Sequence, residues 1–148
     1  MRNYPTIAGR KIRMGLVGCG RIAANHFGAM EQHAVDIEIV DVCDVDRVAL
    51  DKAVQRTGAK GHLSLTEMLE TTTADIVVLA TPSGLHPEQA IEIALSGRHV
   101  MTEKPMATRW HDGLRMVKAC DDAGVRLFVV KQNRRNATLQ LLKRAVEQ

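Results

Sequence analysis

The chain has 148 residues, enough for one ordinary domain with a core of its own but too few for two comfortable ones. Hydrophobic residues make up 45% and charged residues 25%, the balance of a soluble globular protein, and no apolar run approaches the roughly 20 residues that cross a bilayer. The formal net charge is +3, and its basic excess near the C-terminus lacks interleaved aromatic side chains. We therefore expect neither a membrane nor a nucleic acid as partner.

Apolar runs of strand length alternate with segments of helical periodicity along the whole chain. The predicted strands cover residues 14–17, 37–43, 75–80, 99–102 and 125–130. The predicted helices cover residues 21–33, 46–57, 64–73, 86–96, 108–122 and 136–148. This order, with its short connections, predicts an α/β fold with a doubly wound parallel sheet in a single domain. Asp41, inside the second strand, is expected near an edge or loop and is given no role.

The first strand turns into the first helix through a glycine pattern typical of dinucleotide-binding βαβ units. Gly18 allows a tight turn, Gly20 lets the backbone approach a pyrophosphate, and Ala23 keeps the helix close to the strand. The positive end of the helix would then point at the phosphates. A GxGxxA pattern alone is weak evidence, because glycine turns before helices are common. The surrounding motifs must therefore decide whether this turn binds a dinucleotide. The expected cofactor contacts on this turn are Gly18, Cys19, Gly20, Arg21 and Ile22.

Asp44 stands at the tip of the second strand, about two dozen residues after the glycines. A carboxylate there can accept both hydroxyl groups of an adenosine ribose and would repel a 2′-phosphate, which favours NAD over NADP. Capping of the following helix is the competing role, and we assign it to Asp46.

The segment Glu103-Lys104-Pro105 directly follows a predicted strand. In a doubly wound sheet, ligands bind outside the carboxyl ends of the strands. A lysine at this place can donate to a substrate hydroxyl and raise its acidity, which assists the departure of a hydride. Taken in isolation, the same residues would be an exposed charged pair on a loop.

Free thiols in a reducing cytoplasm are the simplest interpretation of the three cysteines, Cys19, Cys43 and Cys120, which are far apart and follow no metal spacing. No metal site is expected. Residues 1–13 are polar and basic without an apolar stretch, so no secretion signal is expected either. The predicted location is therefore the cytoplasm.

Together these motifs resemble the glucose-fructose oxidoreductase and inositol dehydrogenase family (Gfo/Idh/MocA). The matching pieces are the glycine turn, Asp44, the segment 80–86 and the Glu-Lys-Pro element, within Lys11 to about Arg134. The resemblance implies NAD-dependent oxidation of a sugar or cyclitol hydroxyl. It makes Lys104 the catalytic or substrate-orienting lysine and places Glu103 at the nicotinamide end. The residues implied to line the cofactor channel are Thr81, Pro82, Ser83 and His86.

Two of these carried-over positions have competing interpretations. Ser83 stands where family members often have Asn, and His86 could equally cap the helix that it opens. The segment 131–136 is similar to that of nucleotide-sugar 3-dehydrogenases, which oxidise the C3 hydroxyl of UDP-N-acetylglucosaminuronate. That similarity implies that Gln132 lies beside the nicotinamide and Arg134 beside the substrate. A solvated basic helix face is the alternative for the arginine.

Family members continue into a second domain, an open antiparallel sheet with an Asp-x-x-x-His element that this chain lacks. We therefore expect residues 11–135 to form the NAD-binding core and residues 136–148 to form a helix leading toward a substrate domain. On this interpretation the chain is inactive alone, and an unpaired sheet edge would let copies associate. The alternatives are a dinucleotide-binding module or subunit without catalysis, and a methyltransferase using S-adenosylmethionine, which leaves the Glu-Lys-Pro element unexplained.

Overall fold

The computed structural model describes residues 7–147, so residues 1–6 of the basic N-terminal segment, and residue 148, lie outside the described part. Six parallel strands form one sheet in the order β3-β2-β1-β4-β5-β6. The strands are β1 Ile12–Val17, β2 Ile37–Cys43, β3 Lys60–His62, β4 Ile76–Leu79, β5 His99–Thr102 and β6 Leu127–Val129. The helices are α1 Ala23–Gln32, α2 Arg47–Thr57, α3 Leu65–Thr71, α4 His86–Leu95, α5 Trp110–Asp122, the 3-10 helix η1 Gln132–Arg135 and α6 Ala137–Val146.

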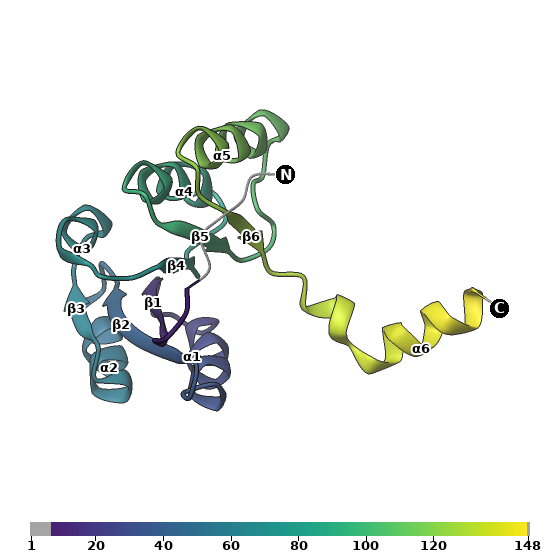
Figure 1. Ribbon diagram of the computed structural model, residues 1–148, viewed down its shortest axis with the longest axis horizontal. Coiled ribbons are helices and arrows are strands. Elements are labelled where there is room, and N and C mark those ends of the chain that lie inside the picture. The colour runs from purple at the N-terminus through teal and green to yellow at the C-terminus, as the bar shows by residue number, and fades with distance from the viewer. Residues whose placement is uncertain (1–6, 148) are drawn as a thin grey trace.

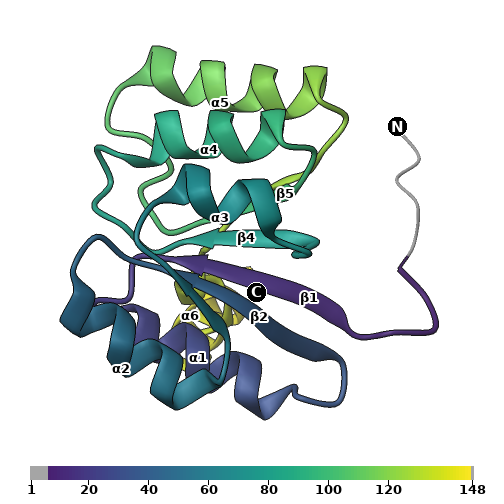
Figure 2. The ribbon, with the colours of Figure 1, turned by 90° about the vertical axis from the view of Figure 1, so that its left-hand side faces the viewer.

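Helices cover both faces of the sheet, as the alternation of strands and helices predicts. α1 and α2 lie on one face, and α3, α4 and α5 lie on the other (Figure 2). The strands β1 and β4 at the centre are buried on both faces, so each supplies residues to two apolar cores. The core under α1 and α2 includes Leu16, Phe27, Val42, Leu50 and Val78. The core under α3, α4 and α5 includes Met68, Leu79, Ile93, Val100 and Met116. The doubly wound α/β fold is therefore confirmed.

Several elements differ from those expected, and the differences at β3, α5 and β6 have identifiable reasons. The strand β3 has no counterpart among the predicted strands, because it is three residues long, contains Gly61 and has one fully buried side chain. The helix α5 begins at Trp110, since Arg109 keeps an extended backbone. The strand β6 covers only Leu127–Val129, because it pairs with β5 on one side and lies at the edge of the sheet.

The helix α6 projects away from the sheet and its two helical layers (Figure 1). It contains no buried residue, and η1 is the element it packs against most closely. Its large apolar side chains are exposed: Leu139, Leu141, Leu142 and Val146. In the described part of the chain, no helix has the length and apolar character of a membrane span.

Candidate cofactor site

The glycine turn lies where the ends of three strands meet. Gly18 follows β1 with a φ of +93°, and its N–H donates to the carbonyl of Cys43, at the end of β2, over 2.8 Å. A Cβ at Gly18 would come within 2.8 Å of the carbonyl carbon of Ala80, just after β4. Both the left-handed backbone and this close approach exclude a side chain. Gly18 therefore holds the turn between β2 and β4.

Gly20 differs from Gly18 because the space beside it is open. A Cβ built on Gly20 would meet no atom of the chain within 4 Å, and its φ is not positive. The helix α1 begins just beyond it, with Ile22 as an N-cap whose side chain makes no capping hydrogen bond, and with no acidic residue in the first turn. Uncapped N–H groups at the positive end of a helix favour an anion. The exposed backbone from Gly20 to Ile22, including Arg21, leaves room for one.

Asp44 closes the glycine turn from the side of β2. Its Oδ2 atom accepts the N–H of Cys19 at 2.6 Å, and its Oδ1 atom accepts the N–H of Asp46 at 2.8 Å. Asp46 caps α2 by accepting the N–H groups of Val48 and Ala49, so the capping role predicted for it is confirmed. The Asp44 carboxylate remains half-buried, and each of its oxygens keeps a lone pair for a further donor.

Cys19 contributes its backbone to this turn rather than a reactive thiol. Burial, and then the charge of Asp44, raise the pKa of the Cys19 thiol to about 12. Burial likewise raises the pKa of Cys43 to about 12 and that of Cys120 to about 11. All three cysteines are free, and at these pKa values they are neutral near pH 7 and poor nucleophiles.

The loop after β4 forms the next wall of the site. Pro82 is exposed, Ser83 is partly exposed, and the hydroxyl of Thr81 donates to the side chain of Gln89 over 2.6 Å. His86 is fully buried at the start of α4 and makes no capping hydrogen bond, so capping is not its role. Its Nε2 lies 2.9 Å from the carbonyl oxygen of Thr81, and its Nδ1 lies 3.1 Å from that of Pro105. The ring is therefore inside the protein rather than on the surface of this loop, and joins the loops after β4 and β5.

Glu103 and Lys104 lie at the end of β5, next to this loop. Glu103 is 9% exposed, and its N–H donates to the carbonyl of Leu79 over 3.0 Å. Its Oε2 atom accepts the N–H of Lys104 at 3.1 Å, and its Oε1 atom lies 2.9 Å from Nε2 of His26. Lys104 is exposed and precedes a cis peptide bond to Pro105. Its ammonium group makes no ion pair with any residue that the structure describes.

Gln132 and Arg134 lie in η1, which continues from β6 at the same edge of the sheet. The N–H of Val130 donates to the carbonyl of Thr102 over 2.9 Å, which brings the start of this segment beside the end of β5. Both predicted site residues are exposed, and the carbonyl of Arg134 accepts a hydrogen bond from the side chain of Gln140. Within residues 7–147, no hydrogen bond joins either of them to the glycine turn.

A buried polar cluster that no pattern in the sequence indicates lies beside Asp44. Asp41 is 4% exposed, with Oδ1 2.8 Å from Nε2 of His62 and Oδ2 accepting the hydroxyl of Thr72 at 2.5 Å. Asp41 does lie beside the edge strand β3, whose last residue is His62, but it is buried there and its carboxylate has a structural role that the sequence does not indicate. The carbonyl of His62 accepts the N–H of Asp44 at 3.2 Å, so the cluster supports the loop that carries Asp44.

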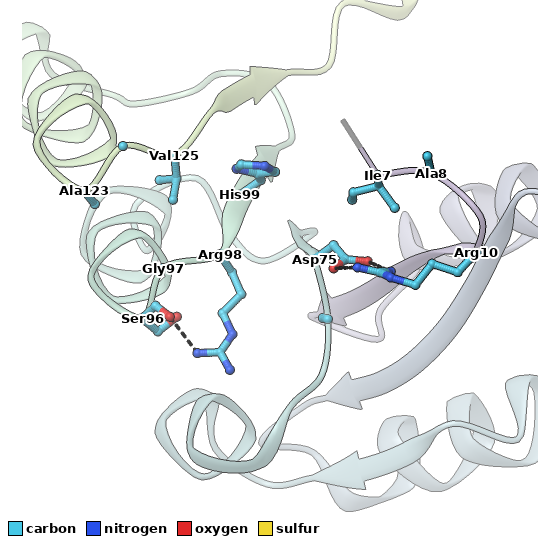
Figure 3. Close-up of a pocket in the computed structure, with 12 residues that line it drawn as sticks. Ile7, Ala8, Arg10, Asp75, Ser96, Gly97, Arg98, His99, Ala123 and Val125 are labelled. Carbon is cyan, nitrogen blue, oxygen red and sulfur yellow. Dashed lines mark hydrogen bonds and ion pairs between the residues drawn. The ribbon is translucent and has the colours of Figure 1, made fainter. Parts of the chain in front are cut away.

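The opposite edge of the sheet, where the strands begin, contains a cleft of about 680 Å³ (Figure 3). Arg10 reaches Asp75 with hydrogen bonds of 2.6 and 2.8 Å, and Asp75 also accepts the N–H of Arg13 at 2.8 Å. Arg98 turns toward the carbonyl of Ser96 instead. The charged groups of the cleft are thus paired within the chain, and ligands of doubly wound sheets bind at the carboxyl edge. We assign this cleft no binding role.

The carboxyl edge, by contrast, offers the groups that a nicotinamide dinucleotide requires. It combines an open glycine backbone with an uncapped helix N-terminus, the acceptor carboxylate of Asp44 and the exposed ammonium group of Lys104. The open space at Gly20 is the decisive feature, since nothing inside the protein requires glycine there. No group of three or more His, Cys, Asp or Glu side chains in the described part is placed to hold a metal ion.

Residues 12–131 match the family model described as "Oxidoreductase family, NAD-binding Rossmann fold" (GFO_IDH_MocA). The chain belongs to the Gfo/Idh/MocA oxidoreductase family. The matched range contains the glycine turn, Asp44 and the Glu-Lys-Pro element, on which the resemblance in the sequence depends. Both the family and its cofactor class, NAD, are therefore confirmed for this domain.

Two solved structures share about two thirds of their aligned residues with this Gfo/Idh/MocA chain. The WlbA dehydrogenase from Chromobacterium violaceum, in complex with NADH and UDP-GlcNAcA, is 69% identical with a TM-score of 0.96, over 99% of this chain and 43% of its own. The WlbA dehydrogenase from Bordetella pertussis, in complex with the same two ligands, is 65% identical with a TM-score of 0.93, over 96% and 42%.

Curated Gfo/Idh/MocA relatives are more distant in sequence. D-apiose dehydrogenase from Paraburkholderia graminis is 32% identical over 139 residues, which are 93% of this chain and 36% of the relative. Inositol 2-dehydrogenase 3 from Saccharopolyspora erythraea is 30% identical over 124 residues, 84% and 37% of the two chains. The chain thus spans about two fifths of the length of its relatives.

Proposed function

We propose that this chain is the cofactor-binding part of an NAD-dependent dehydrogenase that oxidises a hydroxyl group of a nucleotide sugar. The observation that carries the proposal is the 69% identity, over 99% of the chain, with a dehydrogenase solved with NADH and UDP-GlcNAcA. The open space at Gly20 and the uncapped start of α1 support the cofactor half of the proposal.

Different residues would bind the pyrophosphate and the adenosine ribose of the dinucleotide. The backbone of Gly18, Cys19 and Gly20, with Arg21 and Ile22, would hold the pyrophosphate at the start of α1. Asp44 would accept the hydroxyl groups of the adenosine ribose.

The loop after β4 and the segments after β5 and β6 would surround the nicotinamide. Thr81, Pro82 and Ser83 would form one side of it, with His86 holding their loop from behind. Glu103 and Gln132 would contact its other side.

Lys104 is the residue that we propose for chemistry. When bound, the nicotinamide would supply the acceptor for the hydride of the sugar carbon. The Lys104 ammonium group would donate a hydrogen bond to the oxygen on that carbon and stabilise the negative charge that develops there as the hydroxyl proton passes to a general base, a role for which we assign no residue of this chain. The absence of an ion pair for this ammonium group among the described residues leaves it free for that contact. Arg134 would bind an anionic part of the substrate.

For the whole protein we propose a cytoplasmic location and assembly of more than one copy. The three free, largely buried thiols fit a reducing compartment. The strands β3 and β6 at the edges of the sheet each pair on one side only, which leaves hydrogen-bonding groups for a second copy. The chain by itself is expected to bind cofactor without turning over substrate.

The first test is a calorimetric titration of the purified chain with NADH, NADPH and S-adenosylmethionine. We expect NADH to bind most tightly. Gly20→Ala should weaken NADH binding by about tenfold or more, because its Cβ would occupy the space that the pyrophosphate needs. Gly28→Ala is the matched control: it adds the same methyl group to α1 near the flexible end of Arg56.

Equal NADH affinity of the Gly20→Ala and Gly28→Ala proteins would contradict the placement of the pyrophosphate. Preference for S-adenosylmethionine over both dinucleotides would favour a methyltransferase and reject the dehydrogenase. Turnover of a UDP-sugar by the chain alone would contradict the expectation that it is inactive by itself.

A further inference from the structure

His26 and Glu103 form a contact that none of the roles proposed above uses. Nε2 of His26 lies 2.9 Å from Oε1 of Glu103, and the two side chains are 13% and 11% exposed. An ionised carboxylate only accepts hydrogen bonds, so Nε2 carries the hydrogen in this contact. Without that donor, the nearly buried carboxylate would lose a partner that replaces its hydration.

The other side of Glu103 is fixed as well. Its Oε2 atom accepts the backbone N–H of Lys104 at 3.1 Å, and its own N–H donates to the carbonyl of Leu79 over 3.0 Å. The carboxyl group is therefore held between α1 and the backbone of Lys104. A carboxylate that moved away from His26 would also release the Lys104 N–H.

The contact also joins two parts of the site that are distant in the sequence. His26 lies in the first turn of α1, six residues after Gly20, and Glu103 is 77 residues further along the chain. This side-chain contact links α1 to the segment after β5. The helix that begins at the proposed pyrophosphate site is thereby tied to the residue that precedes Lys104.

We propose that His26 is a positioning residue that orients Glu103, and through it the backbone of Lys104, at the nicotinamide end of the cofactor. The inference rests on the proposed function, and it gives His26 no contact with the dinucleotide itself. Loss of the His26 N–H therefore weakens the binding of a ligand that reaches Glu103. A ligand that ends at the pyrophosphate and its ribose groups is bound as before.

The test compares NADH with ADP-ribose, which lacks the nicotinamide, by calorimetry on the whole chain. His26→Leu should lower NADH affinity by about tenfold and change ADP-ribose affinity by less than about twofold. His26→Gln should restore most of the NADH affinity, because the Gln amide can donate a hydrogen bond to Glu103. His33→Leu is the matched control, since His33 is exposed at the other end of α1.

Two results would overturn the proposal. Equal losses of NADH and ADP-ribose affinity, with no rescue by His26→Gln, would mean that His26 only stabilises the fold. Unchanged NADH affinity in the His26→Leu protein would mean that Glu103 needs no positioning.

A second measurement separates this inference from the proposed function. The amide resonance of Lys104 in a ¹⁵N-labelled sample reports its hydrogen bond to Glu103 without any cofactor. If the wild-type chain binds no NADH, the proposed function fails, and this resonance alone decides on the positioning. The positioning is supported if the Lys104 resonance moves in the His26→Leu protein and goes back to its wild-type position in the His26→Gln protein. A Lys104 resonance that does not move in His26→Leu rejects the positioning.

Discussion

Gly18 is subject to two separate constraints, a positive φ and the contact of a Cβ with Ala80 at 2.8 Å. We predict that Gly18→Ala lowers the free energy of unfolding by about 2–4 kcal/mol, because strain at a positive φ is combined with a backbone clash. Chemical denaturation followed by circular dichroism measures the change.

Gly58 supplies the control for this prediction, since its φ is +70° and a Cβ there would meet nothing within 4 Å. Gly58→Ala carries the positive φ alone and should cost about 1 kcal/mol. Equal losses in the Gly18→Ala and Gly58→Ala proteins would show that the approach to Ala80 has no energetic weight.

At the residue scale, the sequence predicts the parts of the site that depend on neighbouring residues. The tight turn at Gly18 and the cap at Asp46 follow from local patterns, and the structure contains both. His26 and His62 were missed because their partners come from other elements. The available signal for His26 was its place three residues after the buried Ala23, on the inner side of α1.

At the element scale, Asp75 joins the segment before β1 to the start of β4. Hydrogen bonds from Arg10, helped by those from Arg13, hold the pKa of Asp75 well below its ordinary value. We predict that Asp75→Asn lowers the free energy of unfolding at pH 7 by about 1–2 kcal/mol, the range of charge-assisted hydrogen bonds that are partly screened by water.

The sign of the pH dependence follows from the direction of that shift. The folded protein keeps Asp75 charged at pH values where the unfolded chain, with a pKa near 3.9, already takes up a proton. The advantage of the wild type is therefore complete above about pH 5 and shrinks as the pH falls toward the folded pKa. Asp51→Asn, which removes an exposed pair with Arg47, should have almost no effect. A pH-independent difference would refute the ion-pair explanation.

Secondary-structure elements with strong periodicity were predictable, and the short edge elements were not. The apolar run of β4 and the capped helices α2 and α3 lie where the sequence places them. The strand β3 is set by its pairing with β2, so its three residues carry no pattern of their own. Edge position also shortens β6, because only β5 supports its hydrogen bonds.

At the scale of the whole molecule, α6 stands apart from the sheet and the helices that cover its two faces (Figure 1). Because the helix buries no residue, we predict that removing residues 136–148 changes the Tm by less than about 2 °C and leaves the affinity for NADH unchanged. Differential scanning calorimetry and the same titration measure both. A large fall in Tm would show that the core does not end at residue 135.

If Asp44 accepts the hydroxyl groups of the adenosine ribose, as we propose, its bond with the Cys19 N–H couples the choice of cofactor to the architecture of the glycine turn. A lineage, or an engineer, that replaced Asp44 with a small neutral residue to admit a 2′-phosphate would also remove the acceptor that closes the glycine turn. A change of preference would therefore require a second substitution that returns an acceptor to Cys19. On that proposal, a change from NAD to NADP would need two substitutions, and the first alone would weaken the binding of both cofactors by loosening the glycine turn.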